Sequence, residues 1–512
     1  MTVQATPPRV RVIGAGAMGA GIAQLLATSG VDVQLADVDA GALDRGAERI
    51  ATQLDREVTR GRLDRAAAVS ALTRIAPIAS PTSAEPCDVV IEAVVEDLKI
   101  KQDLFRGLEA VVGPRTVLAT NTSSLSVTAI ASVLDRPERA VGLHFFNPVP
   151  RMRLVEIVPG VRTAPSVVDL AEELVRRTGH VPVRTADTPG FLVNHAGRGL
   201  VTEALQILDE QIAGPVEIDA IARDVLGLRM GPFELLDLTG LDVSVPVLES
   251  IWAGFYAEPR LRPSASLRGR LLGGLLGRKT GEGFYRYEDG KKIVPASATV
   301  GAVPLDRPIW TDDSDLAALL DASGVERDRG GEPGDRAVVL VSSDGASVIT
   351  EANRRGLPVR RACGVESIGD RTTRLVLAVH PGLDPEVGRV ARAALERTGR
   401  AVSVVRDGPA GVAQRLLASV VNVAAGIAQA RLATPDDIDT AVRLALGYPT
   451  GPLAWGDRVG ADRILAVLGG LLEQTGDPRY RPSSWIVERV ALGLALVDSG
   501  TTPEDIVTPS EE

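Results

Sequence analysis

The sequence predicts a doubly wound α/β domain, an all-α domain after it, and then a partial second copy of both. Three observations predict this architecture. Residues 9–187 alternate β-branched runs with segments of helical periodicity. Residues 190–277 are helical in period and contain few strand runs. Residues 374–411 then repeat the pattern of residues 153–190.

The first α/β unit runs from residue 9 to residue 37. The segment "RVRVIG" predicts a strand, and "GAGAMGAGIAQLLATSG" predicts a tight turn that opens a helix ending at Gly30. The segment "VDVQLADVD" predicts a second strand with an acidic end. The alternation continues in "CDVVIEAVV", "LKIKQDLFRGLEAVV" and "TVLATNTS", which we interpret as strand, amphipathic helix and strand. This succession indicates a parallel sheet.

The glycine turn predicts a dinucleotide site. Gly14 permits the tight turn, Gly16 lets the backbone approach a pyrophosphate, and Gly19 allows close packing of helix on strand. An acid ends the next strand, where a carboxylate can hold a ribose 2′-OH and would repel a 2′-phosphate, so NAD is favoured over NADP. FAD and a turn without a ligand remain alternatives. The predicted cofactor residues here are Gly14, Gly16, Ala17, Met18, Gly19 and Asp37.

The repeat extends beyond its α/β part. Residues 218–242 resemble residues 438–462, and "PRLRPS" is followed much later by "PRYRPS". Aligned in this way, Glu156 corresponds to Leu377 and Asn194 to Gln414, and the segment "HFFNP" has no counterpart. The second copy therefore reads as structural, which implies that the lost residues serve chemistry in the first copy.

Composition excludes several classes of protein. The 512 residues carry a net charge of -10, which argues against a general surface for nucleic acid or an anionic membrane. Cys87 and Cys363 form no spaced pair, which suggests a reducing compartment and no structural zinc. No apolar run looks long enough for a membrane helix, and the first residues lead directly into a strand without the core of a signal peptide. We expect a cytoplasmic protein.

Several short motifs occur in order along the first copy. They are "GAGAMGAGIA", "EAVVEDLKIK", "NTSSL", "HFFNP", "LVEIV" and "FLVNH". The set resembles the 3-hydroxyacyl-CoA dehydrogenase family over roughly residues 9–290, and more weakly over residues 374–495. The resemblance implies a Rossmann-type domain, NAD as cofactor, and oxidation of (S)-3-hydroxyacyl-CoA to 3-oxoacyl-CoA.

The resemblance also implies roles for individual residues. His144 of "HFFNP" is the base and Glu156 of "LVEIV" is its partner, while Ser123 and Asn194 contact the substrate. Asn147 lies near the nicotinamide. Three further residues line the NAD site: Glu96, Lys101 and Lys279. The chain departs from the family at His195, where an arginine is usual.

The chemistry fits these roles. Oxidising a secondary alcohol moves a hydride to the nicotinamide and a proton to a base, and histidine can exchange a proton near neutral pH. A carboxylate beside His144 favours its charged form and fixes the ring tautomer. Ser123 and Asn194 would hold the substrate's oxygens and stabilise the developing alkoxide. The alternative for His144 is a histidine that only fills the core.

The phosphates of CoA need cations. The segment "REVTRGRL" offers Arg56, Arg60 and Arg62 after the first long helix, and we choose Arg60 as the substrate-binding residue. An ordinary solvated face is the alternative.

The expected organisation has four parts. They are an NAD-binding Rossmann domain (1–187), an all-α substrate and dimerisation domain (188–290), a linker with a partial α/β repeat (291–403), and a second, non-catalytic all-α domain (404–512). In single-unit relatives the helical domain pairs with that of another chain. We therefore expect an internal pseudo-dimer of helical domains, and a homo-oligomer stays open.

Other functions share parts of this pattern. The β-hydroxyacid dehydrogenases need a catalytic lysine in the helical domain, but no lysine lies between Lys101 and Lys279. Sugar-nucleotide dehydrogenases need a cysteine nucleophile, which neither cysteine fits. A non-catalytic NAD-binding structural protein stays open. For the substrate, 3-hydroxybutyryl-CoA and 3-hydroxyadipyl-CoA stay open, hence fatty acid β-oxidation or aromatic degradation.

Overall fold

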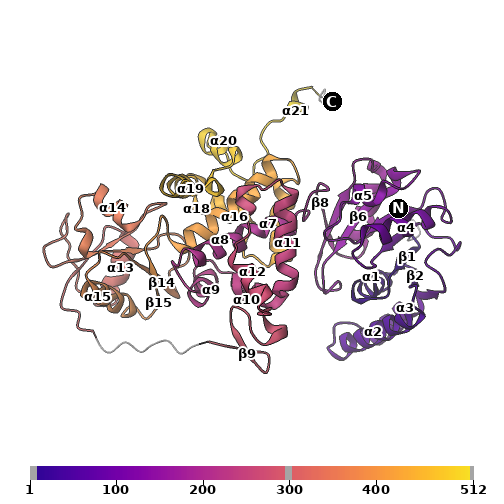
Figure 1. Ribbon diagram of the computed structural model, residues 1–512, viewed down its shortest axis with the longest axis horizontal. Helices are drawn as coiled ribbons and strands as arrows, with labels where there is room; N and C mark the ends of the chain where they lie inside the picture. The colour runs from indigo at the N-terminus through magenta and orange to yellow at the C-terminus, as the bar shows by residue number, and fades with distance from the viewer. Residues whose placement is uncertain (1–7, 295–302, 508–512) are drawn as a thin grey trace. The chain divides into compact units, whose positions relative to one another are not determined.

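A computed structural model describes residues 8–294 and 303–507, and the chain folds into two compact units. The first unit contains residues 1–195 together with residues 432–446. The second contains residues 196–431 and 447–512. The first unit is the indigo to purple part of the ribbon in Figure 1, apart from its later segment.

An eight-stranded sheet forms the centre of the first unit, in the order β3-β2-β1-β4-β5-β6-β7-β8. All neighbours are parallel except β6 and β7, which are antiparallel. The strands are β1 (Val10–Ile13), β2 (Val33–Ala36), β3 (Ile75–Ile78), β4 (Val89–Glu92), β5 (Val117–Thr120), β6 (Ala140–Phe145), β7 (Leu154–Pro159) and β8 (Val181–Arg184).

Helices cover this sheet, so β1, β2, β4 and β5 are buried along their whole length, as their Val- and Ile-rich sequences require. The covering helices are α1 (Ala17–Thr28), α2 (Ala40–Thr59), α3 (Arg65–Thr73), α4 (Leu98–Glu109), α5 (Val127–Ala131) and α6 (Pro165–Arg177). The strand order reverses between β1 and β4. Ligands bind at such a reversal, beyond the carboxyl ends of the strands.

The second unit begins with the helices of the first copy. They are α8 (Arg198–Asp209), α9 (Pro215–Asp224), α10 (Pro232–Thr239), α11 (Leu241–Gly254) and α12 (Ser266–Leu272), followed by a hairpin of β9 (Arg286–Glu288) and β10 (Lys291–Ile293). The second copy adds α16 (Val412–Gln429), α18 (Pro452–Val459), α19 (Ala461–Thr475), α20 (Ser484–Leu492) and α21 (Pro503–Val507). The predicted succession of α/β and all-α parts is confirmed.

Helix α16 is the central helix of these two sets. It is apolar and long enough to cross a membrane, but 83% of it is buried inside the structure, as expected for a core helix. It packs along α8 so closely that a Cβ on Gly199 would lie 2.9 Å from the carbonyl oxygen of Ser419. Only glycine allows the two backbones to approach in this way.

A second sheet shows that the α/β copy is larger than the sequence suggested. Its order is β11-β12-β13-β14-β15, with only β13 and β14 antiparallel, which reproduces the arrangement of β4 to β8. Its elements are β11 (Ile309–Trp310), α13 (Ser314–Ala322), β12 (Val338–Val341), α14 (Val348–Arg354), β13 (Ala362–Val365), β14 (Arg374–Val379), α15 (Pro385–Glu396) and β15 (Ala401–Arg406). Within the expected linker and partial repeat (291–403), the α/β copy begins as early as β11, whose two residues are too few to show a strand pattern in the sequence.

Candidate active site

The glycine turn between β1 and α1 has space for a ligand at one position only. Gly14 has φ +99°, and a Cβ on it would lie 2.5 Å from the carbonyl oxygen of Ala93. A Cβ on Gly19 would lie 1.7 Å from the carbonyl oxygen of Gly14. Protein packing therefore requires both glycines. A Cβ on Gly16 would meet nothing, and Gly16 precedes α1 without a side-chain cap. This open, uncapped helix N-terminus fits the pyrophosphate of NAD.

Asp37 lies directly beside this turn. Its Oδ2 accepts a hydrogen bond of 2.7 Å from the backbone N–H of Ala15, and its Oδ1 accepts one of 3.0 Å from Asp39. The side chain is half-buried at the end of β2, so part of the carboxylate stays open. The structure thus brings the predicted ribose-binding carboxylate to the glycine turn.

His144 and Glu156 are opposite each other on the antiparallel strands β6 and β7. The distance between His144 Nδ1 and Glu156 Oε2 is 2.5 Å. The other oxygen, Oε1, accepts hydrogen bonds from the backbone N–H groups of Leu192 (2.9 Å) and Val193 (2.7 Å). Glu156 is fully buried, and both of its oxygens have hydrogen-bond partners. It also anchors the start of α7 (Val193–Ala196), the short helix that carries Asn194.

Aromatic rings surround the histidine. The ring centroid of Phe146 lies 4.4 Å from that of His144, and the centroid of Phe191 lies 5.7 Å from it. The His144 residue is only 5% exposed, so water has little access to its ring. Asn147, which follows Phe146, is exposed. The arrangement is a dry imidazole with a carboxylate on one nitrogen, which suits proton transfer from its other nitrogen.

Ser123 follows β5 and is exposed in a loop that Glu96 holds. Oε1 of Glu96 accepts hydrogen bonds from the hydroxyl of Thr122 (2.6 Å) and from the backbone N–H groups of Ser123 (2.9 Å) and Ser124 (3.0 Å). Burial would raise the pKa of Glu96, but these hydrogen bonds and the nearby Lys101 hold that pKa below its usual value.

Two connections were not predicted from the sequence. Asn121 Oδ1 accepts a hydrogen bond of 2.8 Å from the backbone N–H of Phe145, which ties the serine loop to the strand of the histidine. The Lys101 side chain is 1% exposed, and its Nζ lies 2.6 Å from Glu92 Oε1 and 3.3 Å from Glu96 Oε2. The only sequence signal for Glu92 is a carboxylate that ends an apolar strand.

Lys279 belongs to the second unit. Its Nζ lies 2.6 Å from Asp242 Oδ1, and its side chain is partly exposed. Its predicted place at the cofactor site stays a prediction.

A basic cavity of about 640 Å³ lies between α1, α2 and residues 147–151. Five arginines line it: Arg49, Arg56, Arg60, Arg62 and Arg151. Three of them, Arg56, Arg60 and Arg62, belong to the segment that the sequence offered. Arg49 and Arg56 are seven residues apart on α2, a helical spacing that could have identified Arg49. Arg60 is exposed and lies 3.6 Å from Glu57, the carboxylate in this lining.

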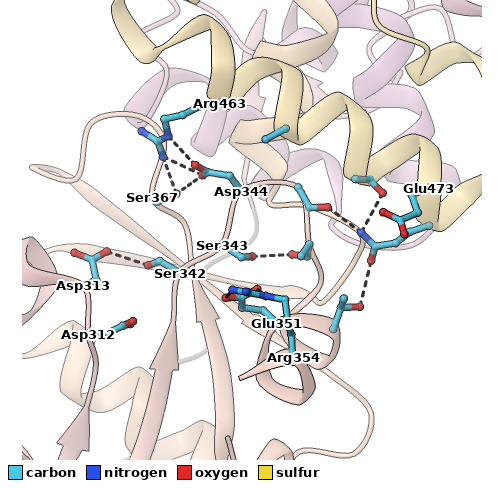
Figure 2. Close-up of a pocket in the computed structure, with 16 residues that line it drawn as sticks. Asp312, Asp313, Ser342, Ser343, Asp344, Glu351, Arg354, Ser367, Arg463 and Glu473 are labelled. Atoms are coloured by element: carbon cyan, nitrogen blue, oxygen red, sulfur yellow. Dashed lines mark hydrogen bonds and ion pairs between the residues drawn. The ribbon is translucent and has the colours of Figure 1, made fainter. Parts of the chain in front are cut away.

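The copy has a cavity of its own, of about 1030 Å³, at the carboxyl ends of β11 and β12 (Figure 2). Gly142 and Gly364 match, because a Cβ on either would meet the first residue of the preceding helix, Val127 or Val348. Two residues on, Glu366 takes the place of His144. Burial raises the pKa of Glu366 to about 7.

Charged side chains that line this second cavity form ion pairs with each other. Asp344, which takes the place of Ser123, accepts two hydrogen bonds from Arg463 (2.7 and 2.9 Å) and one from Ser367 (2.9 Å). Figure 2 shows Arg463 directed at Asp344 and Ser367. In the described residues of this cavity, neither the histidine nor the serine of the first site has a counterpart.

Comparisons with known proteins agree with this geometry. The model described as "3-hydroxyacyl-CoA dehydrogenase, NAD binding domain" matches residues 9–188. The model described as "3-hydroxyacyl-CoA dehydrogenase, C-terminal domain" matches twice, at residues 190–287 and 412–502.

Individual relatives match over one copy or both. A 3-hydroxyadipyl-CoA dehydrogenase of Escherichia coli is 39% identical over 96% of this chain and 98% of its own length. A probable 3-hydroxybutyryl-CoA dehydrogenase of Bacillus subtilis is 37% identical and covers 55% of this chain and 98% of its own. The crystal structure of a 3-hydroxybutyryl-CoA dehydrogenase from E. coli has a TM-score of 0.82 at 37% identity, over 95% of this chain and 99% of its own.

Proposed function

Because the chain belongs to the 3-hydroxyacyl-CoA dehydrogenase family, we propose that it oxidises an (S)-3-hydroxyacyl-CoA to the 3-oxoacyl-CoA with NAD. The observation that carries this proposal is the buried pair of His144 and Glu156, in the same unit as the open glycine turn. A structural NAD-binding protein would have no need for a buried imidazole and carboxylate in an apolar wall.

In the proposed mechanism, His144 removes the proton of the substrate hydroxyl. Glu156 accepts a hydrogen bond from His144 Nδ1, so Nδ1 carries the ring proton and Nε2 has a free lone pair. The Glu156 carboxylate then stabilises the positive charge that the ring gains. When bound, NAD supplies the nicotinamide that accepts the hydride. Ser123 and Asn194 orient the substrate's oxygens.

The nucleotide end of CoA is proposed to bind the basic cavity, with Arg60 among the residues that hold its phosphates. Arginine pairs well with phosphate because its planar fork offers two donors at once. The neighbouring arginines, Arg56 and Arg151, add positive charge to the same cavity.

The acyl chain is proposed to be that of 3-hydroxybutyryl-CoA or 3-hydroxyadipyl-CoA, which are the substrates in the names of the relatives. An assay that follows NADH consumption with acetoacetyl-CoA tests the activity. A panel of hydroxybutyryl, hydroxyhexanoyl and hydroxyadipyl thioesters then tests the chain. No turnover with any of them would remove the proposal and favour the non-catalytic alternative.

The two helical sets are proposed to form an internal pseudo-dimer. Arg262 and Arg481 are equivalent in "PRLRPS" and "PRYRPS". Arg262 lies 2.5 Å from Asp477, and Arg481 lies 3.8 Å from Glu258, the residues that directly precede these two segments. Such reciprocal contacts are typical of a two-fold interface.

The edge strand of each sheet is followed by or ends in a residue that binds the helical set of the other copy, again reciprocally. The backbone N–H of Ala186, after β8, donates to Leu432 (2.8 Å), and that of Arg406, at the end of β15, donates to Ile212 (2.9 Å). A four-part chain is therefore proposed, with the α/β copy starting near residue 303. The reducing cytoplasm is the proposed compartment, because both cysteines are free thiols.

A further inference from the structure

Glu92 is a fully buried carboxylate to which the proposed mechanism gives no role. It ends β4, and its Oε1 accepts hydrogen bonds from Lys101 Nζ (2.6 Å) and from the backbone N–H of Val94 (2.7 Å). Its Oε2 accepts one of 2.8 Å from the hydroxyl of Thr120. Burying two opposite charges costs desolvation energy, so such a pair is weak evidence for a stabilising role.

A continuous series of contacts leads from this pair to the serine loop. Lys101 Nζ lies 3.3 Å from Glu96 Oε2, which places the lysine between two carboxylates. The other oxygen of Glu96 holds the Thr122 hydroxyl and the backbone N–H groups of Ser123 and Ser124. The position of Ser123 therefore depends on Glu96, and the position of Glu96 depends on Lys101.

The second copy shows that this sheet arrangement forms without the series. Strands β4 and β11 occupy equivalent positions next to β5 and β12, and Asp97 and Asp313 cap the helices that follow them. Four residues after each cap stand Lys101 and Ala317, so the copy has no lysine there. Its loop between strand and cap is also shorter, and Asp312, which directly precedes the cap as Glu96 does, lies 2.5 Å from Arg355 instead of a lysine.

The copy lacks this lysine together with the histidine and the serine. We propose that Glu92 is a positioning residue of the dehydrogenase site: through Lys101 and Glu96 it fixes the loop that presents Ser123 to the substrate. This inference rests on the proposed function. With Glu92 neutral, Lys101 keeps a single charged partner and draws Glu96 away from the loop, and small displacements of a positioning group are costly in catalysis.

The test compares Glu92→Gln with Glu109→Gln in the full-length enzyme. Glu109 is the matched control, because it forms the ion pair with buried Arg139 in the same unit, at the other end of α4 (3.1 Å). In Glu92→Gln, kcat per folded enzyme should fall by about 10-fold or more, because the loop loses its geometry. In Glu109→Gln only thermal stability should change. Equal kcat losses in both variants, or a kcat of Glu92→Gln within about twofold of wild type, would overturn the proposal.

A second variant covers poor folding of the first. Glu92→Gln combined with Lys101→Met buries no unpaired charge and leaves Glu96 bound to its loop. Its kcat should lie above that of Glu92→Gln and below wild type by about threefold or more. Wild-type kcat in this double variant would overturn the proposal. Absence of turnover in the wild type itself would instead refute the proposed function.

Discussion

His144 and Glu156 face each other across β6 and β7, with 2.5 Å between Nδ1 and Oε2. The second oxygen of Glu156 binds the two backbone N–H groups at the start of α7. One carboxylate thus fixes the histidine ring and the helix that carries Asn194. The proposed base and a proposed substrate contact are positioned by the same buried group.

Glu156→Gln should slow turnover by about 10-fold or more, because the histidine loses the charge that stabilises its protonated form. The pH profile of oxidation should also change, because the histidine loses its charged partner. Initial rates across pH measure both effects. An unchanged profile would count against the pair.

Asp37 should determine the choice of cofactor. Asp37→Ser together with Val38→Arg removes the carboxylate and adds a cation at a position that is 91% exposed. The ratio of kcat/KM for NADP to that for NAD should rise by about 10-fold or more, because a 2′-phosphate then meets a cation instead of an anion. If the wild type already prefers NADP, the role of Asp37 is wrong.

Arg60→Ala should raise KM for the acyl-CoA by about 10-fold, since a charge-assisted hydrogen bond to phosphate is lost. Arg45→Ala is the control, because Arg45 lies on α2, which Arg60 directly follows, pairs with Asp39 and is not among the residues that line the basic cavity. A thioester truncated before its phosphates should be unaffected by either change. Equal effects of Arg60→Ala on both thioesters would refute phosphate binding.

Truncation near residue 290 should expose the face of α8 that α16 covers. Arg415 of α16 is fully buried and lies 2.6 Å from Glu203 of α8, so the fragment loses the partner of a buried charge. Loss of one partner typically costs about 3–5 kcal/mol. Light scattering and thermal melting should reveal a dimer, aggregation or reduced stability. A monomeric, soluble and fully active fragment would refute the pseudo-dimer.

The first site could be predicted in large part because its motifs are local. The glycine turn, Asp37 and the strands of His144 and Glu156 each combine residue type with a period that the sequence displays. The structure brings them together in one unit. Glu92 escaped prediction because its partner Lys101 comes from a helix, and that pairing depends on packing.

The second copy was harder to predict than the first. Strand β11 has two residues, so the start of the α/β copy shows no strand pattern in the sequence. Sequence alignment matched Glu156 with Leu377, which lies on the equivalent strand β14 but pairs with Val365 and not with Glu366. The structure shows that Glu366, directly after the neighbouring strand β13, accepts a hydrogen bond of 2.9 Å from the backbone N–H of Ala413 at the start of α16. Both copies thus have a carboxylate that binds the start of a helix, but it comes from β7 in the first copy and from the end of β13 in the second.

The most direct measurement of the central claim is the rate of NADH formation from (S)-3-hydroxybutyryl-CoA or (S)-3-hydroxyadipyl-CoA by the wild type and by His144→Gln. The wild type should reduce NAD. The variant should bind NAD with unchanged affinity and turn over about 10²-fold to 10⁴-fold more slowly, as expected for loss of a general base. A variant with near-normal kcat would contradict the assignment of His144 as the base.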